Sequence, residues 1–130
     1  MIVINVKDLS GTSRDISCPN DGFRSLRAIV RSDGVGFSLN KTIIPPGEPQ
    51  RWHYKHHKEA CYCVSGKGVL LNENDGCKWS IEPGVLYVLD DNDPHTFQAY
   101  TEVVLISVFS PALEGGEIHQ ADGSYPRSDT

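Results

Sequence analysis

The chain has 130 residues, with 12 Lys and Arg against 17 Asp and Glu, so its formal net charge is −5. An acidic chain is a poor match for nucleic acid or an anionic membrane, because both attract a basic surface. No stretch approaches the roughly 18 apolar residues of a membrane-spanning helix, and the opening Met-Ile-Val-Ile-Asn lacks the order of a secretion signal. These features predict one globular domain in the cytoplasm.

Short apolar and β-branched runs alternate with turn signals along the chain. Twelve Gly and eight Pro residues are spread between these runs, which is typical of an all-β barrel or sandwich. In chain order, the expected strands are Ile2–Val6, Leu26–Arg31, Gly36–Ile44, Trp52–Tyr54, Glu59–Val64, Gly68–Asn72, Lys78–Ile81, Val85–Leu89, His95–Ala99 and Val103–Phe109. From Pro111 onward the sequence is polar and Gly-rich, so we expect a barrel over about residues 1–111 and a short, loosely held polar tail over 112–130.

Two blocks of sequence concentrate the residues that could carry chemistry. The first runs Gly47-x5-His53-x-Lys55-x3-Glu59-x6-Gly66, and the second runs Gly84-x5-Asp90-x-Asn92-x2-His95. These spacings resemble the two motifs of the cupin superfamily, a jelly-roll barrel whose inward side chains converge on one metal. Lys55 stands where the pattern has its second His. Because an ammonium group is a poor ligand at neutral pH, the usual set of three His and one Glu is incomplete.

Longer strings resemble one cupin family, the ectoine synthases. They are residues 34–39 (GVGFSL), 53–63 (HYKHHKEACYC), 83–90 (PGVLYVLD) and 117–126 (EIHQADGSYP). The resemblance spans nearly the whole chain and implies a hydro-lyase of the cytoplasm that closes N-γ-acetyl-L-2,4-diaminobutyrate into the cyclic amidine ectoine, a compatible solute, with loss of water. It also implies iron(II) or another divalent metal as cofactor, and a head-to-tail homodimer.

The metal ligands implied by the resemblance are Glu59, Tyr87 and His95. The barrel motifs select Glu59 and His95 independently, and a carboxylate with an imidazole suits iron. Tyr87 is the less expected ligand, because a phenol with an ordinary pKa of about 10 must be acidified by the charge of the metal.

The resemblance also implies a substrate site. It assigns Tyr54, His57, Glu117 and His119 to catalysis and Phe23, Ser25, Arg27, Thr42, Ser107 and Phe109 to substrate binding. The general cupin spacing would select His53 instead, whereas strand alternation places His57 on the face of Glu59; we follow the closer family and interpret His53 and His56 as structural or surface residues. Glu117 and His119 can act as an acid–base pair only if the tail folds over the barrel, and taken alone they are typical of a solvated tail.

Two positions depart from the family pattern. Phe23 stands in place of a Trp, which keeps an aromatic wall but removes an indole N–H donor, and Ser107 stands in place of a Cys. The sequence therefore leaves two hypotheses open. The chain is either an ectoine synthase, or a diverged cupin that binds or converts a related small amide or amino-acid derivative, including a sensory binding module.

Overall fold

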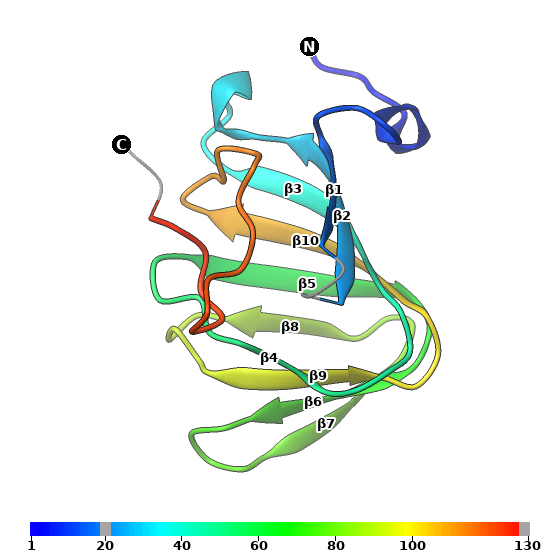
Figure 1. Cartoon of the computed structure of the whole chain (residues 1–130), viewed down its shortest axis with the longest axis vertical. Coiled ribbons are helices and arrows are strands. Elements are labelled where there is room, and N and C mark those ends of the chain that lie inside the picture. Colours follow the sequence, from blue (N-terminus) through cyan, green and yellow to red (C-terminus); the bar gives the residue numbers. More distant parts are fainter. Residues whose placement is uncertain (19–21, 128–130) are drawn as a thin grey trace.

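Two antiparallel sheets pack against each other in the computed structural model (Figure 1). The structure describes residues 1–18 and 22–127, without the side chain of Cys18. The larger sheet has the strand order β1-β2-β3-β10-β5-β8, and the smaller sheet has the order β4-β9-β6-β7. The prediction of an all-β fold is confirmed. No helix in this part of the chain is long and apolar enough to cross a bilayer.

The elements follow one another along the chain as η1 (Val6–Leu9), β1 (Asp15–Cys18), β2 (Phe23–Ile29), η2 (Arg31–Asp33), β3 (Ser38–Ile44), β4 (Gln50–Trp52), β5 (Lys58–Ser65), β6 (Gly68–Asn72), β7 (Lys78–Ile81), β8 (Leu86–Leu89), β9 (His95–Ala99) and β10 (Val103–Ser110), where η denotes a short 3-10 helix.

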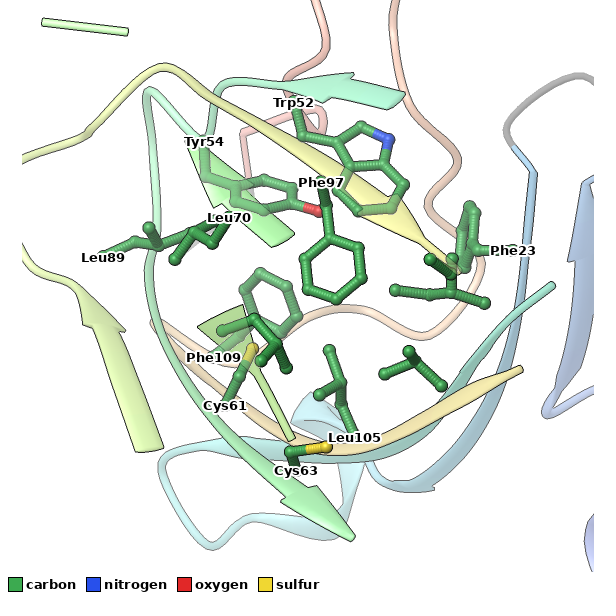
Figure 2. Close-up of a cluster of buried hydrophobic side chains, with 14 of the residues drawn as sticks. Phe23, Trp52, Tyr54, Cys61, Cys63, Leu70, Leu89, Phe97, Leu105 and Phe109 are labelled. Carbon is green, nitrogen blue, oxygen red and sulfur yellow. The ribbon is translucent and has the colours of Figure 1, made fainter. Parts of the chain in front are cut away.

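Alternation along the strands builds the core and also places polar groups inside it. On β10, every second side chain from Val103 to Phe109 is buried, and Ser107 is one of them. On β5, the inward residues are Glu59, Cys61 and Cys63. Figure 2 shows the apolar side chains that meet between the two sheets. The inner face of the larger sheet is therefore apolar at one end and polar near Glu59 and Ser107.

The glycine that ends the first motif block is required by the turn after β5. Gly66 has a φ of +89°, and a Cβ atom there would collide with the backbone carbonyl of Glu102. Only glycine adopts this backbone conformation without strain and leaves room for the approach of the neighbouring chain. The turn allows β5 to end beside β10, which carries Ser107.

The N-terminal prediction is wrong in two respects. Residues 1–5 form no strand; Met1–Ile4 are exposed, and the Asn5 side chain accepts the Lys7 N–H at 3.0 Å to begin η1. Strand β1 was not predicted, because Asp15–Cys18 has little apolar character of its own. It pairs with β2, and the Arg24 guanidinium donates to both carboxylate oxygens of Asp15 at 2.9 and 3.0 Å.

The segment after β10 packs on the barrel, so the expectation of a loosely held tail is wrong. Leu113 is fully buried and Tyr125 is 3% exposed. Backbone groups tie the segment down, because the Leu113 N–H donates to Ser38 Oγ at 3.0 Å and the His53 N–H donates to the Gly123 carbonyl at 2.9 Å. This arrangement brings Glu117 and His119 to the barrel (Figure 1, orange to red).

Candidate functional site

A small cavity lies between the inner faces of the two sheets. Its volume of about 20 Å³ holds about one water molecule. Eight of the expected site residues line it, and they are Phe23, Thr42, Tyr54, Glu59, Tyr87, Ser107, Phe109 and His119. Ser25, Arg27, His57, His95 and Glu117 do not line it, although all five are buried.

Sequence reasoning missed several residues of this cavity, among them Asn40, Trp52 and Tyr125. Asn40 carries a signal that could have found it, because it lies two positions before Thr42 on β3 and therefore on the same face. Trp52 and Tyr125 gave no such signal, since aromatic residues usually serve the core. Tyr125 lies in the segment expected to be a loose tail.

A row of polar side chains crosses the larger sheet at one level. In the strand register, Arg27 on β2 pairs with Asn40 on β3, Asn40 pairs with Ser107 on β10, Ser107 pairs with Cys61 on β5, and Cys61 pairs with Tyr87 on β8. Directly paired residues lie about 4.5–5.5 Å apart. We call these five residues the polar row. It connects the Arg27 guanidinium at one end with the Tyr87 phenol at the other.

Hydroxyl and thiol groups link the middle of the polar row. Ser107 Oγ lies 3.0 Å from Thr42 Oγ1 and 3.6 Å from Cys61 Sγ. Cys61 and Cys63 are free thiols, and burial raises the pKa of Cys61 well above its ordinary value. Cys61 is therefore a neutral thiol in the row, beside the residues expected to bind a metal.

Glu59 on β5 and Tyr87 on β8 are acids on neighbouring strands, and Glu59 is buried whereas Tyr87 is partly buried. Burial raises the pKa of Glu59 to about 8, against smaller opposing effects of hydrogen bonds from Cys61 and Ser107. Burial also raises the pKa of Tyr87 well above its ordinary value. Ionising either group inside the barrel is costly without a cation, and a bound divalent metal supplies that charge.

His95 reaches the same region from β9 of the smaller sheet. Its Nδ1 lies 3.0 Å from the Asp93 carbonyl oxygen, so an Nδ1–H donates there and Nε2 keeps its lone pair. Burial lowers the pKa of His95 and favours the neutral, ligating form. His95 and Tyr87 together line a hollow of about 510 Å³ that also contacts Trp79 of β7 and Leu86 of β8.

These three side chains fit a metal ion. Within residues 1–18 and 22–127, no three His, Cys, Asp or Glu side chains form a group that could hold a metal. A metal site built on Glu59 and His95 would need a further ligand of another kind, such as the phenol of Tyr87. The tautomer of His95 suits a metal ligand, and within the described residues no cation is paired with the acids at positions 59 and 87.

Aromatic rings from the C-terminal segment close the cavity. The His119 ring stacks on Trp52 with centroids 5.2 Å apart and on Tyr125 at 4.4 Å. His119 Nε2 also lies 2.7 Å from the Tyr54 hydroxyl. Because the cavity holds about one water molecule, a larger ligand requires these rings to move.

A buried ion pair holds the same segment from the other side. Arg27 donates to a Glu117 carboxylate oxygen at 3.4 Å, to the Glu117 backbone carbonyl at 2.7 Å and to Ser25 Oγ at 3.3 Å. The Glu117 carboxylate also accepts the N–H groups of Glu114 and Gly115 at 2.6 and 2.7 Å. Both charges are thus paired and hydrogen-bonded, as buried ions must be.

His57 and Tyr54 lie on the loop between β4 and β5. Asn92, with a φ of +49°, supports this loop by donating from Nδ2 to the carbonyls of Tyr54 at 2.9 Å and His57 at 3.4 Å. Burial lowers the pKa of His57, so the imidazole is neutral near pH 7 and can accept a proton. By contrast, His56 is exposed and His53 is half-buried.

The comparisons with known proteins agree on one family. The model of the family described as "Ectoine synthase" matches residues 1–129. L-ectoine synthases from Teredinibacter turnerae and Oceanobacillus iheyensis are each 41% identical, over 96% and 97% of this chain and 95% and 97% of their own lengths. The chain belongs to the ectoine synthase family.

Solved structures support the same fold. The crystal structure of ectoine synthase from P. lautus aligns with a TM-score of 0.87 and 35% identity, over 99% of this chain and 94% of that one. A polyketide cyclase from Streptomyces resistomycificus, at 18% identity and a TM-score of 0.70, shows likeness of fold alone. The expected cupin fold is confirmed. The expected enzyme class is confirmed as well, since ectoine synthases are lyases.

The buried pair between Arg27 and Glu117 generates a stability prediction. Glu117→Ala leaves the Arg27 cation buried with only a backbone carbonyl and a hydroxyl, so the free energy of unfolding falls by about 3 kcal/mol. Glu114→Ala is the matched control, because the Glu114 pair with Arg31 is exposed and contributes about 1 kcal/mol or less. Urea denaturation measures both, and equal losses in the two variants would contradict the role assigned to Glu117.

Proposed function

We propose that the chain closes N-γ-acetyl-L-2,4-diaminobutyrate to ectoine with loss of water. The observation that carries the proposal is the polar row, which runs inside a barrel of the ectoine synthase family from Tyr87 to Arg27. A substrate with an acetamide at one end and a carboxylate at the other needs a polarising site and a cation at separate ends of one cavity. The row places the Tyr87 phenol at the cavity and the Arg27 guanidinium behind the cavity wall, where Glu117 pairs with it, so carboxylate binding requires the substrate to share or displace this contact.

The reaction forms one bond and breaks another inside a single molecule. The α-amine nitrogen bonds to the acetamide carbonyl carbon, the carbon–oxygen bond then breaks, and the two amine protons leave with the oxygen as water. We assign to the neutral imidazole of His57 the removal of the ammonium proton that frees the amine lone pair, and the amidine product takes this proton up again. We assign to His119, whose ring is hydrogen-bonded to the Tyr54 hydroxyl, the transfer of the two amine protons to the leaving oxygen, with Glu117, two residues earlier in the chain, as its acid–base partner. Holding amine and carbonyl in near-attack geometry lowers the barrier further.

The remaining site residues bind and orient the substrate in this proposal. The Arg27 guanidinium, with Ser25 beside it, binds the substrate carboxylate. Thr42 and Ser107, whose hydroxyls lie 3.0 Å apart, provide hydrogen bonds along the chain of the substrate. Phe23 and Phe109 supply apolar walls that exclude water.

Glu59, Tyr87 and His95 hold the metal in this proposal, as iron(II) or another divalent ion. A metal bound there supplies Lewis acidity that polarises a carbonyl group. The support lies in the residues themselves. They are the buried Glu59 and the partly buried Tyr87, with which no cation of the described residues is paired, and an imidazole that donates from Nδ1 and keeps a lone pair on Nε2.

The metal proposal predicts the metal content of variants. Glu59→Gln and His95→Ala should each lose stoichiometric iron(II), because each leaves two protein ligands. His56→Ala is the control, since its side chain is exposed, and it should bind iron like the unaltered chain. Metal analysis after anaerobic loading and gel filtration measures this. A full iron content in either ligand variant would contradict the assignment.

An assay of the purified chain tests the reaction and separates it from the alternative. With iron(II) and the acetylated diamine, chromatography should show ectoine accumulating over many turnovers. The alternative is a diverged cupin acting on a related amide, and the departures at Phe23 and Ser107 favour it. An iron-loaded chain that forms no ectoine would contradict the proposed function and support the alternative.

We also propose that the whole chain is one cupin domain and forms a homodimer. The outer face of β5 and β8 exposes Tyr62, Val64, Leu86 and Val88, by 48, 49, 62 and 51%, and β8 is an edge strand. The arm at Met1–Ile4 is a second exposed apolar surface. Such surfaces mark interfaces, and an unpaired edge can accept a further strand. The head-to-tail arrangement and the location in the cytoplasm stay predictions.

The proposed dimer predicts a change in mass. The unaltered chain should sediment as a dimer, and Leu86→Lys combined with Val88→Lys should sediment as a monomer, because two charges would be buried at the interface. Tyr100→Lys is the control, since Tyr100 is 61% exposed at the turn between β9 and β10 and should leave the dimer intact. A monomeric unaltered chain would contradict the proposal.

A further inference from the structure

Lys55 occupies the position that a metal-binding His has in the general cupin pattern. In the structure its Nζ donates to Asp122 Oδ2 at 2.9 Å, across 67 residues of sequence. Both side chains of this ion pair are 45% exposed, so the pair lies at the surface of the barrel. The position that supplies a ligand in the cupin pattern therefore supplies a contact to the C-terminal segment in this chain.

Asp122 belongs to a tight turn that hydrogen bonds fix. The Ser124 N–H and hydroxyl donate to Asp122 Oδ1 at 3.0 and 2.6 Å, and the Gln120 N–H donates to the Ser124 carbonyl at 2.7 Å. Hydrogen bonds from Ser124, with a smaller effect of Lys55, lower the pKa of Asp122, so its carboxyl group is an anion at neutral pH. One carboxylate oxygen thus shapes the turn, and the other meets Lys55.

The same turn lies against β4 and the residues that follow it. The His53 N–H donates to the Gly123 carbonyl at 2.9 Å, and Arg51 Nη1 donates to the Asp122 carbonyl at 3.3 Å. Gly123 has a φ of +85°, and a Cβ atom there would lie 3.0 Å from the Arg51 carbonyl oxygen. The ion pair of Lys55 therefore adds to a close approach that the backbone already makes.

The turn carries the rings that close the cavity. His119 precedes it and Tyr125 follows it, and their rings stack with centroids 4.4 Å apart. Tyr54, the neighbour of Lys55 in sequence, has its hydroxyl 2.7 Å from His119 Nε2. The same two stretches of chain are thus joined twice, by Tyr54 with His119 and by Lys55 with Asp122. A shift of the turn at Asp122 would move the imidazole away from Tyr54.

We propose that Lys55 is a positioning residue, whose ion pair with Asp122 holds His119 against Tyr54 when the site is closed. The inference rests on the proposed function, in which His119 transfers protons to the leaving oxygen. Because the closed cavity holds about one water molecule, the rings must move to admit the substrate and return before the reaction. An exposed ion pair suits this cycle, because it contributes little free energy and so breaks and re-forms readily.

Amide hydrogen exchange tests the contact without any reaction. Lys55→Met removes the charge and keeps most of the length of the side chain. Exchange at the His53 N–H and over residues 118–125 should become about threefold faster, as expected for the loss of an exposed ion pair. Lys58→Met is the control, because Lys58 is exposed on β5 and takes part in no ion pair among the described residues. It should leave this exchange unchanged.

Two further variants at position 55 separate the charge from the side chain. Lys55→Arg keeps a cation and should restore slow exchange, whereas Lys55→Glu places two anions together and should exchange faster than Lys55→Met. Asp122 itself is left unaltered in this series, because it also accepts hydrogen bonds from Ser124.

The kinetics of the iron(II)-loaded variants test the effect on His119. With the acetylated diamine as substrate, kcat should be unchanged in Lys55→Arg, about threefold lower in Lys55→Met and lowest in Lys55→Glu. The iron content and the urea midpoint should stay equal across the series. A merely structural role would lower stability or iron content in that order, and Lys55→Arg would not restore kcat selectively.

Several outcomes overturn the proposal. They are equal exchange in Lys55→Met and the unaltered chain, an equal effect of Lys58→Met, or faster exchange in Lys55→Met with an unchanged kcat. If the unaltered chain forms no ectoine, the proposed function fails instead. The exchange measurements then still decide whether Lys55 holds the turn that carries His119, because they require no substrate.

Discussion

Glu59 places a carboxyl group on the inner face of β5, where its neighbours Cys61 and Ser107 are neutral and its pKa rises to about 8. A buried acid without a cation is costly to ionise, and a second acid, Tyr87, lies on the neighbouring strand β8, where it pairs with Cys61. An ordinary core would have apolar residues at these positions. A bound cation would offset the free-energy cost of placing Glu59 and Tyr87 inside the barrel, and this is the basis of the proposed metal site.

The barrel deals with its buried charges in two contrasting ways. Arg27 and Glu117 neutralise each other, and backbone groups complete their hydrogen bonds. Among the described residues, Glu59 and Tyr87 have only neutral hydrogen-bond partners such as Cys61, and no cation is paired with either of them. The first arrangement fixes the C-terminal segment over the barrel. The second leaves binding capacity for ligands from outside the chain, which is what a site needs.

Strand positions inside the barrel followed well from sequence, because alternation on β5 and β10 and the motif spacings are local signals. Gly66 is an example, because the turn after β5 requires a residue with a positive φ, and the sequence shows a glycine at that position. The strand predicted near the N-terminus was wrong. The apolar side chains of residues 1–5 suggested a strand, yet within the described residues this arm lies exposed and outside both sheets. The packed C-terminal segment was missed because its order comes from contacts such as Leu113 with Ser38, far apart in sequence.

The candidate site was predictable to a similar extent. Family strings pointed to residues such as Glu59 and His119, but they gave no reason to single out Asn40. Asn40 lines the cavity because the register places it between Arg27 and Ser107, which is a property of the folded chain.

The central claim is that metal and substrate bind between the two ends of the polar row. A crystal structure of the iron(II)-loaded chain with ectoine tests it most directly. We expect the metal on Glu59, Tyr87 and His95 and the carboxylate of ectoine at Arg27. Ectoine or metal bound elsewhere, with Glu59 still unoccupied in the interior, would contradict this expectation.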